Sequence, residues 1–170
     1  MDILPNLGNI LINVMQYFKK ELLSKINSDD RKQREDAEKE WEENCKLYSQ
    51  KFNEIKKRLP RRFMKAFLSR NGLHDYTFLK ICVEGKKKGR YSCKLQLTNG
   101  SEIVSIAMIN LVSAQIDITT FSSCILGKLS WGYCEFDLTP AKNIQLSLIC
   151  DIENEMRFEF QSIRISAQQV

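Results

Sequence analysis

The sequence is poor in the residues on which many enzyme sites depend. Its 170 residues include one histidine, His74, with seven glycines and three prolines. A zinc site of the HExxH type and a multi-histidine phosphohydrolase site each need at least two histidines, so one chain cannot assemble either. Gly-rich phosphate loops and the GxSxG, CxxC and EF-hand patterns are also missing. We therefore expect no metal ion and no cofactor.

Long apolar segments are absent too. Charges interrupt every hydrophobic stretch before the roughly 20 residues that a membrane-spanning helix needs. Hydrophobic residues make up 43% of the chain and charged residues 28%, as in a globular domain with a sizeable core. No secretory signal is visible. We expect a cytoplasmic protein with no membrane span and with its six cysteines reduced and packed as small hydrophobic residues.

The first 72 residues predict helices. Apolar residues recur at three- and four-residue steps over 5–26, and a narrow apolar seam predicts a second long helix after a cap at Ser28 or Asp29. Pro60 suits the first position of a third, short helix, and Asn71-Gly72 supplies its stop. The seam consists of Trp41, Cys45, Tyr48, Phe52, Ile55 and Leu59.

Residues 73–167 predict a mainly antiparallel sheet of about six strands. Asn99-Gly100 favours a type I′ turn with residue 98 opposite 101, and the Gly-Lys-Lys-Lys-Gly loop places 84 opposite 90, with Cys82 and Cys93 on opposite faces. We therefore predict a single α+β domain over 1–170, in which the helical part, 1–72, packs on the sheet. Further strands are expected at 115–120, 129–138, 143–150 and 156–165, the last two as a hairpin.

Positive charge is concentrated in two segments. The chain carries a net charge of +5, but 51–70 holds eight basic residues against Glu54 alone, and 80–94 holds six against Glu84. The loop Lys86–Lys88 adds a second basic patch if it lies on the same side as the first. Such a cluster is typical of nucleic-acid or phosphate binding, and it is equally compatible with pairing to acidic stretches of this chain or of a partner protein. The candidate basic patch is Lys57, Arg58, Arg61, Arg62 and Lys65.

Two short motifs hold the other candidate site residues. His74-Asp75 has the chemistry of a general base or of one metal ligand, so both are candidate catalytic residues; the alternative is that they cap the turn between helix and strand. Trp131, Tyr133 and Glu135 alternate along a predicted strand. If their common face is exposed, these three residues form a plausible binding surface for another protein.

Five short motifs follow one another along the chain: Gln16-Tyr17-Phe18-Lys19-Lys20-Glu21-Leu22, Trp41-x-x-Asn44-x-x-x-Tyr48, Leu59-Pro60, Leu73-His74-Asp75 and Trp131-Gly-Tyr133-Cys-Glu135. Their order resembles an uncharacterised bacterial family of low-GC Gram-positive bacteria. The similarity covers about 15–166 and implies a small cytosolic protein with helices followed by a sheet, without an established activity. Because such proteins begin near the Tyr-Phe run, we expect Met15 to be the native start.

Three functions remain open on the sequence. The first is a non-enzymatic interaction module, of an accessory or immunity type, that binds another protein through the Trp131/Tyr133 face or the helical seam. The second is a nucleic-acid or phosphate binder that uses the basic patch. The third is an enzyme centred on His74 and Asp75. Because no complete catalytic set is visible, we favour the first.

Overall fold

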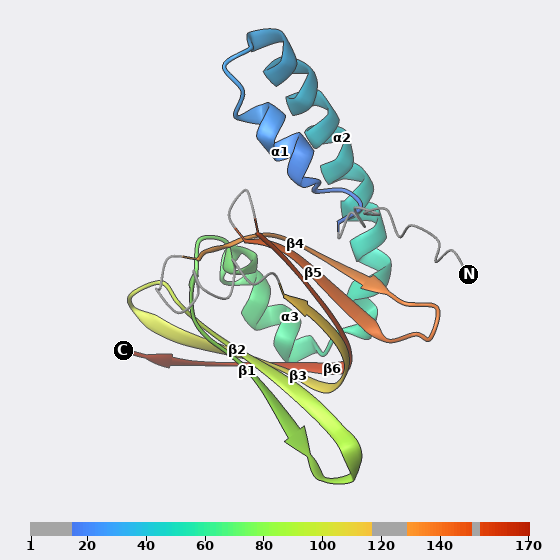
Figure 1. Ribbon diagram of the computed structural model, residues 1–170, viewed down its shortest axis with the longest axis vertical. Coiled ribbons are helices and arrows are strands. Elements are labelled where there is room, and N and C mark those ends of the chain that lie inside the picture. The colour runs from blue at the N-terminus through green and yellow to red at the C-terminus, as the bar shows by residue number, and fades with distance from the viewer. Residues whose placement is uncertain (1–14, 117–128, 151–153) are drawn as a thin grey trace, which may run out of the picture.

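The computed structural model describes residues 15–116, 129–150 and 154–170 as an α+β fold, which confirms the predicted class (Figure 1). Three α-helices come first: α1 (Lys20–Ile26), α2 (Arg31–Ile55) and α3 (Arg61–Leu68), with short 3-10 turns η1 (Lys56–Arg58) and η2 (Asn71–Leu73). The strands are β1 (Thr77–Lys86), β2 (Arg90–Thr98), β3 (Glu102–Ile116), β4 (Trp131–Leu138), β5 (Ile144–Cys150) and β6 (Asn154–Gln169), with the turn η3 (Lys87–Gly89) between β1 and β2. None of the described helices is long and apolar enough to cross a bilayer.

The first helix is shorter than its apolar pattern predicts. Residues 5–14, and with them the expectation about the native start, lie outside the described residues, and 15–19 are not helical. The backbone N–H groups of residues 16–18 donate to the Glu135 carboxylate. Because these three groups bind a side chain 117 to 119 positions away, a regular helix begins only at Lys20.

The two other helices follow the sequence closely, with three corrections. Asp30, one residue after the predicted cap positions, caps α2 by accepting a hydrogen bond from the Gln33 N–H, and Pro60 is the N-cap residue of α3 and not its first helical residue. Cys45, placed on the seam by its spacing, is exposed, while Asn44 points inward and donates to the Tyr17 carbonyl. Past α3, Gly72 takes a positive φ of 65° and ends the helical part as predicted.

The six strands form one antiparallel sheet in the order β1-β2-β3-β6-β5-β4. The sheet curls, because the start of β4 returns to the start of β1. Thr77 and Ser130 form an antiparallel bridge there, and the Trp131 N–H donates to the Tyr76 carbonyl at 2.8 Å. This closure brings residues 73–78 and 129–133 together, although more than 50 positions separate them in the sequence.

The core lies between the inner face of this curled sheet and α3 (Figure 1). Phe63 and Phe67 of α3 pack edge-on against Phe136 of β4. α2 runs past the outer edge of β4, where the Tyr48 hydroxyl accepts a hydrogen bond from the Phe136 N–H at 2.7 Å. On the C-terminal side of Tyr48, Phe52 packs against the inner core, and towards the N-terminus Trp41, together with Tyr48, covers the other face of the sheet. The apolar seam of α2 therefore packs on this chain's own sheet.

Strand registers differ from the predicted ones by two residues in both N-terminal hairpins. Thr98 pairs with Ile103, and Glu84 pairs with Ser92. In the turn between β2 and β3, the Asn99 side chain accepts hydrogen bonds from the N–H groups of residues 101 and 102, and these bonds favour a longer loop than a type I′ turn. A shift of two preserves the alternation of faces, so the predicted faces keep their sides apart from Leu79, which a bulge leaves 44% exposed. Burial along the β1–β2 hairpin ends before its tip, where Val83 and Tyr91 are exposed.

The remaining sheet predictions also have clear outcomes. In the last hairpin Ile144, Leu146 and Leu148 pair with Phe160, Phe158 and Met156, as predicted. Cys82 and Cys93 lie on opposite strand faces, and the five cysteines within the described residues form no disulfide. Three of the predicted features lie wholly or partly outside the described residues. They are the sixth cysteine, positions 117–120 of the strand expected at 115–120, and the turn at 151–153.

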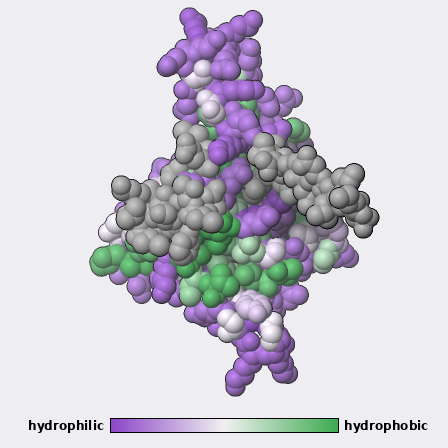
Figure 2. Space-filling view, viewed as in Figure 1, coloured by the Kyte–Doolittle hydropathy of each residue, from purple (hydrophilic) through white to green (hydrophobic). Residues whose placement is uncertain are grey.

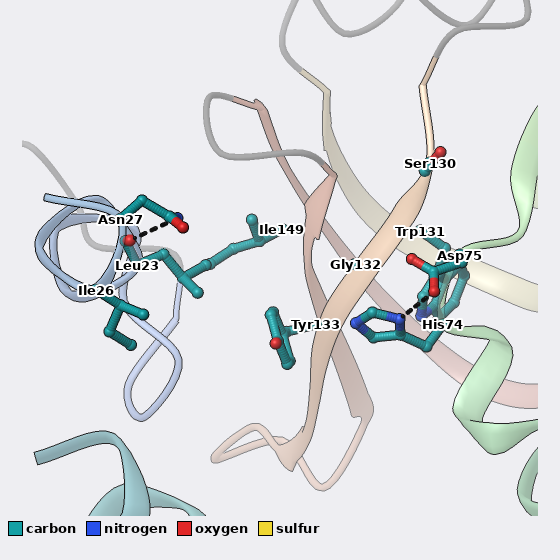
Figure 3. Close-up of a pocket in the computed structure, with 10 residues that line it drawn as sticks. All are labelled: Leu23, Ile26, Asn27, His74, Asp75, Ser130, Trp131, Gly132, Tyr133 and Ile149. Carbon is teal, nitrogen blue, oxygen red and sulfur yellow. Dashed lines mark hydrogen bonds and ion pairs between the residues drawn. The ribbon is translucent and has the colours of Figure 1, made fainter. Parts of the chain in front are cut away.

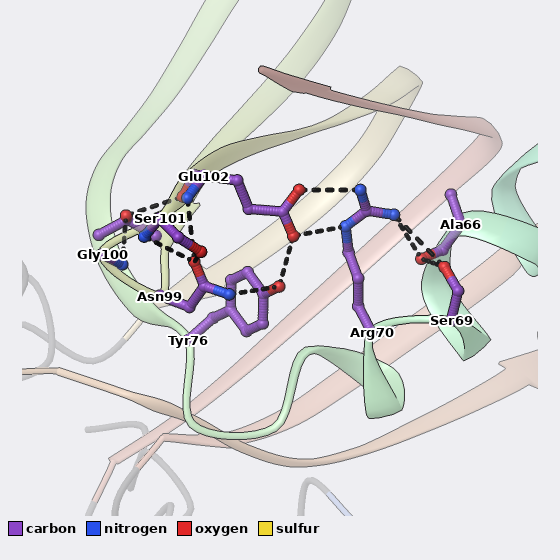
Figure 4. Close-up of polar contacts among 9 residues, drawn as sticks. Ala66, Ser69, Arg70, Tyr76, Asn99, Gly100, Ser101 and Glu102 are labelled. Atoms are coloured by element: carbon purple, nitrogen blue, oxygen red, sulfur yellow. Dashed lines mark hydrogen bonds and ion pairs between the residues drawn. The ribbon is translucent and has the colours of Figure 1, made fainter. Parts of the chain in front are cut away.

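A polar cluster ties the end of the helical part to the sheet (Figure 4). Arg70 makes a bidentate contact with Glu102 at the start of β3, at 2.8 and 2.9 Å, and the Tyr76 hydroxyl donates to the same carboxylate at 2.6 Å. Hydrogen bonding by Arg70, with a further contribution from Tyr76, lowers the pKa of Glu102 below its ordinary value. Glu102 is therefore held as a carboxylate in the folded protein.

This lowered pKa predicts an acid-sensitive contribution to stability. A carboxyl group with a lower pKa when folded stabilises the protein above its unfolded pKa and loses that contribution as pH falls through the folded value. We expect the stability of the native protein to fall more steeply below about pH 4.5, the ordinary value for the group, than that of Glu102→Gln. Urea unfolding across a series of acidic pH values tests this, and parallel curves for the two proteins would contradict it.

Candidate functional site

The motif residues His74 and Asp75 lie where the helical part meets the sheet. The chain turns sharply there: Asn71, Gly72, Leu73 and Asp75 all have positive φ. The Asp75 N–H donates to the Trp131 carbonyl at 2.9 Å, which fixes the turn against β4. The His74 Nδ1 atom lies 3.0 Å from the Asp75 carboxylate. The two side chains thus contact each other beside β4. Backbone hydrogen bonds hold the turn, so the prediction that these two side chains cap it is wrong.

Trp131 does not share a face with Tyr133 and Glu135, so the predicted stripe is wrong for this residue. β4 has a bulge at Gly132, where a Cβ atom would come within 2.7 Å of the Ile149 carbonyl oxygen. The bulge turns Trp131 into the main core, where it is 1% exposed and stacks on Phe78. A strict period of two cannot describe a strand that contains an extra residue.

The opposite face of β4 is covered by the chain's own N-terminal segment. Glu135 is 7% exposed and accepts the three backbone N–H groups of residues 16–18 at 2.6 to 2.9 Å. Tyr133 contacts the rings of Phe18 and Trp41, with ring centres 5.8 and 4.7 Å apart. Of the three predicted binding residues, two are buried and one is half-buried, so they do not form an open surface for a partner.

A cavity of about 280 Å³ lies between α1 and the start of β4 (Figure 3). It collects His74, Asp75, Trp131 and Tyr133, and the His74 ring meets the Tyr133 ring edge-on with 5.2 Å between ring centres. Glu135 lies elsewhere, in a separate hollow with Lys19 and Arg157. Two of the five family-like motifs, Leu73-His74-Asp75 and Trp131-Gly-Tyr133-Cys-Glu135, therefore contribute side chains to one cavity, to which Glu135 does not belong.

The site lacks an assembled nucleophile or metal centre among the described residues. Burial raises the pKa of the Cys93 and Cys134 thiols to about 12, and that of Cys45 is raised by burial and by Glu42. A thiol with a raised pKa is a poor nucleophile. The described ranges contain no group of three or more His, Cys, Asp and Glu side chains placed to hold a metal ion.

The predicted basic patch is solvent-exposed throughout: Lys57, Arg58, Arg61, Arg62 and Lys65. It belongs to a larger positive region. Residues 56–116 contain 13 Lys and Arg against three Asp and Glu, whereas the rest of the chain holds 13 against 18. Two of the three acidic side chains, Glu84 and Glu102, already pair with basic residues of the same region. The basic charge is thus concentrated on η1, α3 and the β1–β2 hairpin.

Two hollows lie within this region and meet at Arg164 of β6. One, of about 510 Å³, is bordered by Arg61, Arg62 and Arg164; the other, of about 490 Å³, is bordered by basic side chains at the β1–β2 tip and again by Arg164. Figure 2 shows this tip, at the bottom of the view, as hydrophilic. The basic residues of the two hollows therefore form a continuous surface.

Sequence reasoning missed two residues that border these hollows. Arg164 is distant in sequence from both basic segments, and only the β3–β6 register, which pairs it with Ala107, brings it beside them. Tyr91 falls on the predicted buried face but is 53% exposed, since the helices do not cover the hairpin tip. Alternation along the strand could have predicted that Arg164 faces outward. Nothing in the sequence indicates that the helices leave Tyr91 uncovered.

Comparisons of this chain with protein-family models, with curated proteins and with solved structures find no match. The resemblance to an uncharacterised bacterial family stays a hypothesis for this reason. Function must therefore be inferred from the geometry and charge of the chain itself.

Proposed function

We propose that the protein binds nucleic acid, without catalysis, through a basic surface. We define the basic surface as the exposed Lys and Arg side chains of η1, α3, the β1–β2 hairpin and β6. It consists of Lys56, Lys57, Arg58, Arg61, Arg62, Lys65, Lys80, Lys86, Lys87, Lys88, Arg90, Lys94 and Arg164.

The segregation of charge carries this proposal. A net charge of +5 is modest when it is spread evenly over a chain. Here residues 56–116, with 13 basic and three acidic residues, have a net charge of +10, and the rest of the chain, with 13 basic and 18 acidic residues, has a net charge of −5. A positive field of this kind attracts a polyanion such as a phosphate backbone, and the release of counterions from that backbone drives binding. The favoured sequence-based hypothesis, a protein-binding stripe, loses support because Trp131 and Glu135 are buried.

The shape of the basic surface supports nucleic acid over a flat anionic membrane. The β1–β2 hairpin projects beyond the body of the molecule (Figure 1), and a two-stranded ribbon is narrow enough to enter the major groove of a duplex. The half-exposed Tyr91 ring near the tip offers a stacking surface for an unpaired base. Contacts from Lys and Arg to phosphates carry no sequence information, so the expected binding is not sequence-specific.

Salt dependence and a paired variant test the proposal. We expect a fluorescein-labelled oligonucleotide to bind at low salt, and its affinity to fall steeply between about 50 and 200 mM salt. Arg61→Gln/Arg62→Gln removes two phosphate contacts, which should lower the salt slope by about two and the affinity at 0.1 M salt by about 60-fold. Fluorescence anisotropy with single-stranded and duplex DNA measures both quantities.

The matched control removes the same charge from another place. Arg31→Gln/Lys32→Gln lies at the exposed start of α2, outside the basic surface, and should leave the affinity within about twofold. Equal losses in the two variants, or no binding at low salt, would refute the proposal. Tighter binding to polyglutamate or to anionic vesicles than to DNA would also refute it and point to an acidic protein or a membrane.

A further inference from the structure

The cavity beside His74 has the size and walls of a small-molecule site. Its volume of about 280 Å³ equals that of roughly nine water molecules at about 30 Å³ each. Leu23 and Ile26 of α1 and Ile149 of β5 form its apolar lining (Figure 3), and Leu23 and Ile149 belong to the same buried cluster. The site is independent of the basic surface, since no Lys or Arg side chain among the described residues lines it.

Three polar side chains around this cavity present hydrogen-bond acceptors, beside the Ser130 and Tyr133 hydroxyls, which can donate or accept. Because the His74 Nδ1 atom contacts the Asp75 carboxylate at 3.0 Å, the ring carries its proton on Nδ1 when neutral and presents the Nε2 lone pair. The Asn27 amide nitrogen donates to the Leu23 carbonyl at 3.0 Å, so its Oδ1 atom is left to accept. The Asp75 carboxylate accepts only. Three acceptors beside two hydroxyls that can adapt favour a ligand that donates hydrogen bonds.

Charge and aromatic contacts narrow the ligand further. Asp75 supplies the negative charge of the lining, and its side chain is 85% exposed at the mouth of the cavity. The Tyr133 ring forms part of the wall, and an aromatic ring attracts a cation over its face. An ammonium group combines the two required properties, positive charge and N–H donors. An alkyl chain attached to it suits the wall of Leu23, Ile26 and Ile149.

The backbone that holds this acceptor set is strained. Leu73 and Asp75 have φ values of 66° and 69°, a conformation that costs free energy in residues other than glycine. Leu73 is fully buried, and the Asp75 N–H is tied to β4, so the surrounding structure maintains this strain. Strained residues cluster at ligand sites because the conformation positions a functional side chain. Here it directs the His74–Asp75 pair beside the cavity.

We propose that this cavity binds a small molecule with a primary ammonium group and a short apolar chain. The ammonium donates to the Nε2 atom of His74 and lies against the Tyr133 ring. The Asp75 carboxylate, which contacts Nδ1 on the other side of the same ring, orients the imidazole and supplies the negative charge. The apolar chain lies against Leu23, Ile26 and Ile149. Asn27 accepts a hydrogen bond from a second donor of the ligand.

Titration of the whole protein with n-butylammonium chloride tests the proposal. We expect saturable shifts of the His74, Gly132 and Tyr133 resonances in NMR spectra, with a Kd in the millimolar range. Asp75→Asn should weaken binding about fivefold, because it removes the charge and keeps the shape of the side chain. This variant should fold normally, since the side chain is exposed and asparagine tolerates a positive φ.

Two further ligands test whether binding needs the N–H donors and the positive charge of the ligand. One control variant tests whether it needs the carboxylate at position 75. Tetramethylammonium carries the charge without N–H donors and should bind more weakly, while butyrate should not bind. Asp36→Asn, an exposed carboxylate on α2, should leave the affinity for n-butylammonium unchanged. Absence of saturation up to about 50 mM, equal binding of tetramethylammonium or butyrate, or equal losses in the two Asp variants would overturn the proposal. None of these results depends on nucleic-acid binding.

Discussion

Glu135→Ala should lower the free energy of unfolding by about 3 kcal/mol, because hydrogen bonds to a charged acceptor contribute about 1.5–3 kcal/mol each and water replaces part of what is lost. The carboxylate accepts three successive backbone N–H groups, from residues 16–18, and is nearly inaccessible to solvent. It binds this segment as an anion is bound by a concave run of peptide N–H groups. Urea denaturation measures the loss of stability.

A local readout distinguishes loss of this anchor from general damage. The amide protons of residues 16–18 should exchange faster with solvent in Glu135→Ala, whereas those of β2 and β3 should change only with global stability. Glu135→Gln, which keeps one acceptor oxygen and loses the charge, should give an intermediate stability.

The control for this prediction lies two residues along the same strand face. Asp137 forms an ion pair with Lys51 at 3.3 Å, with both side chains more than one third exposed. Exposed pairs of this kind contribute about 0–1 kcal/mol, so Asp137→Asn should cost under about 1 kcal/mol. If Glu135→Ala cost no more than Asp137→Asn, the segment 15–19 would be held by its apolar side chains alone.

The contrast between these carboxylates shows where sequence reasoning stops. Strand alternation places Glu135 and Asp137 on one face, and it does so correctly. It cannot show that the segment 16–18 arrives on that face, because this contact spans more than 110 positions. The apolar spacing over 5–26 favours a continuous helix, yet the long-range acceptor competes for the N–H groups that a helix would use at 15–19.

Local features are predictable where short-range chemistry decides them. The stop at Gly72 and the pairing of Ile144 with Phe160 follow from residue types within one turn or one hairpin. Bulges at Leu79 and Gly132 were missed because they arise from packing across the sheet, and each moves an adjacent side chain to an unexpected environment. The same limit applies to the candidate site. The sequence singled out His74, Asp75 and Tyr133, but the curl of the sheet brings them together.

The closure of the curled sheet depends on Trp131, and truncating this side chain should destabilise the fold at least as much as losing the Glu135 anchor. Trp131 is 1% exposed, stacks on Phe78 and contacts Phe67 edge-on, so it joins β4, β1 and α3. Its N–H group and carbonyl also bond residues 76 and 75. Truncating a buried side chain of this size leaves a cavity, which costs about 3–5 kcal/mol.

Trp131→Ala should therefore lower the free energy of unfolding by about 3–5 kcal/mol, and Trp131→Phe by clearly less, since a ring would still contact Phe78. Trp41→Ala is the matched control: Trp41 is only half-buried and packs on Phe18 and Tyr133 outside the main core. It should cost about 1–2 kcal/mol, because the partly exposed site leaves little cavity behind. Urea denaturation of the three variants ranks their losses of stability. A larger loss for Trp41→Ala than for Trp131→Ala would contradict the prediction. It would mean that the aromatic cluster on the outer face, and not the closure of β4 onto β1, holds the sheet in its curled form.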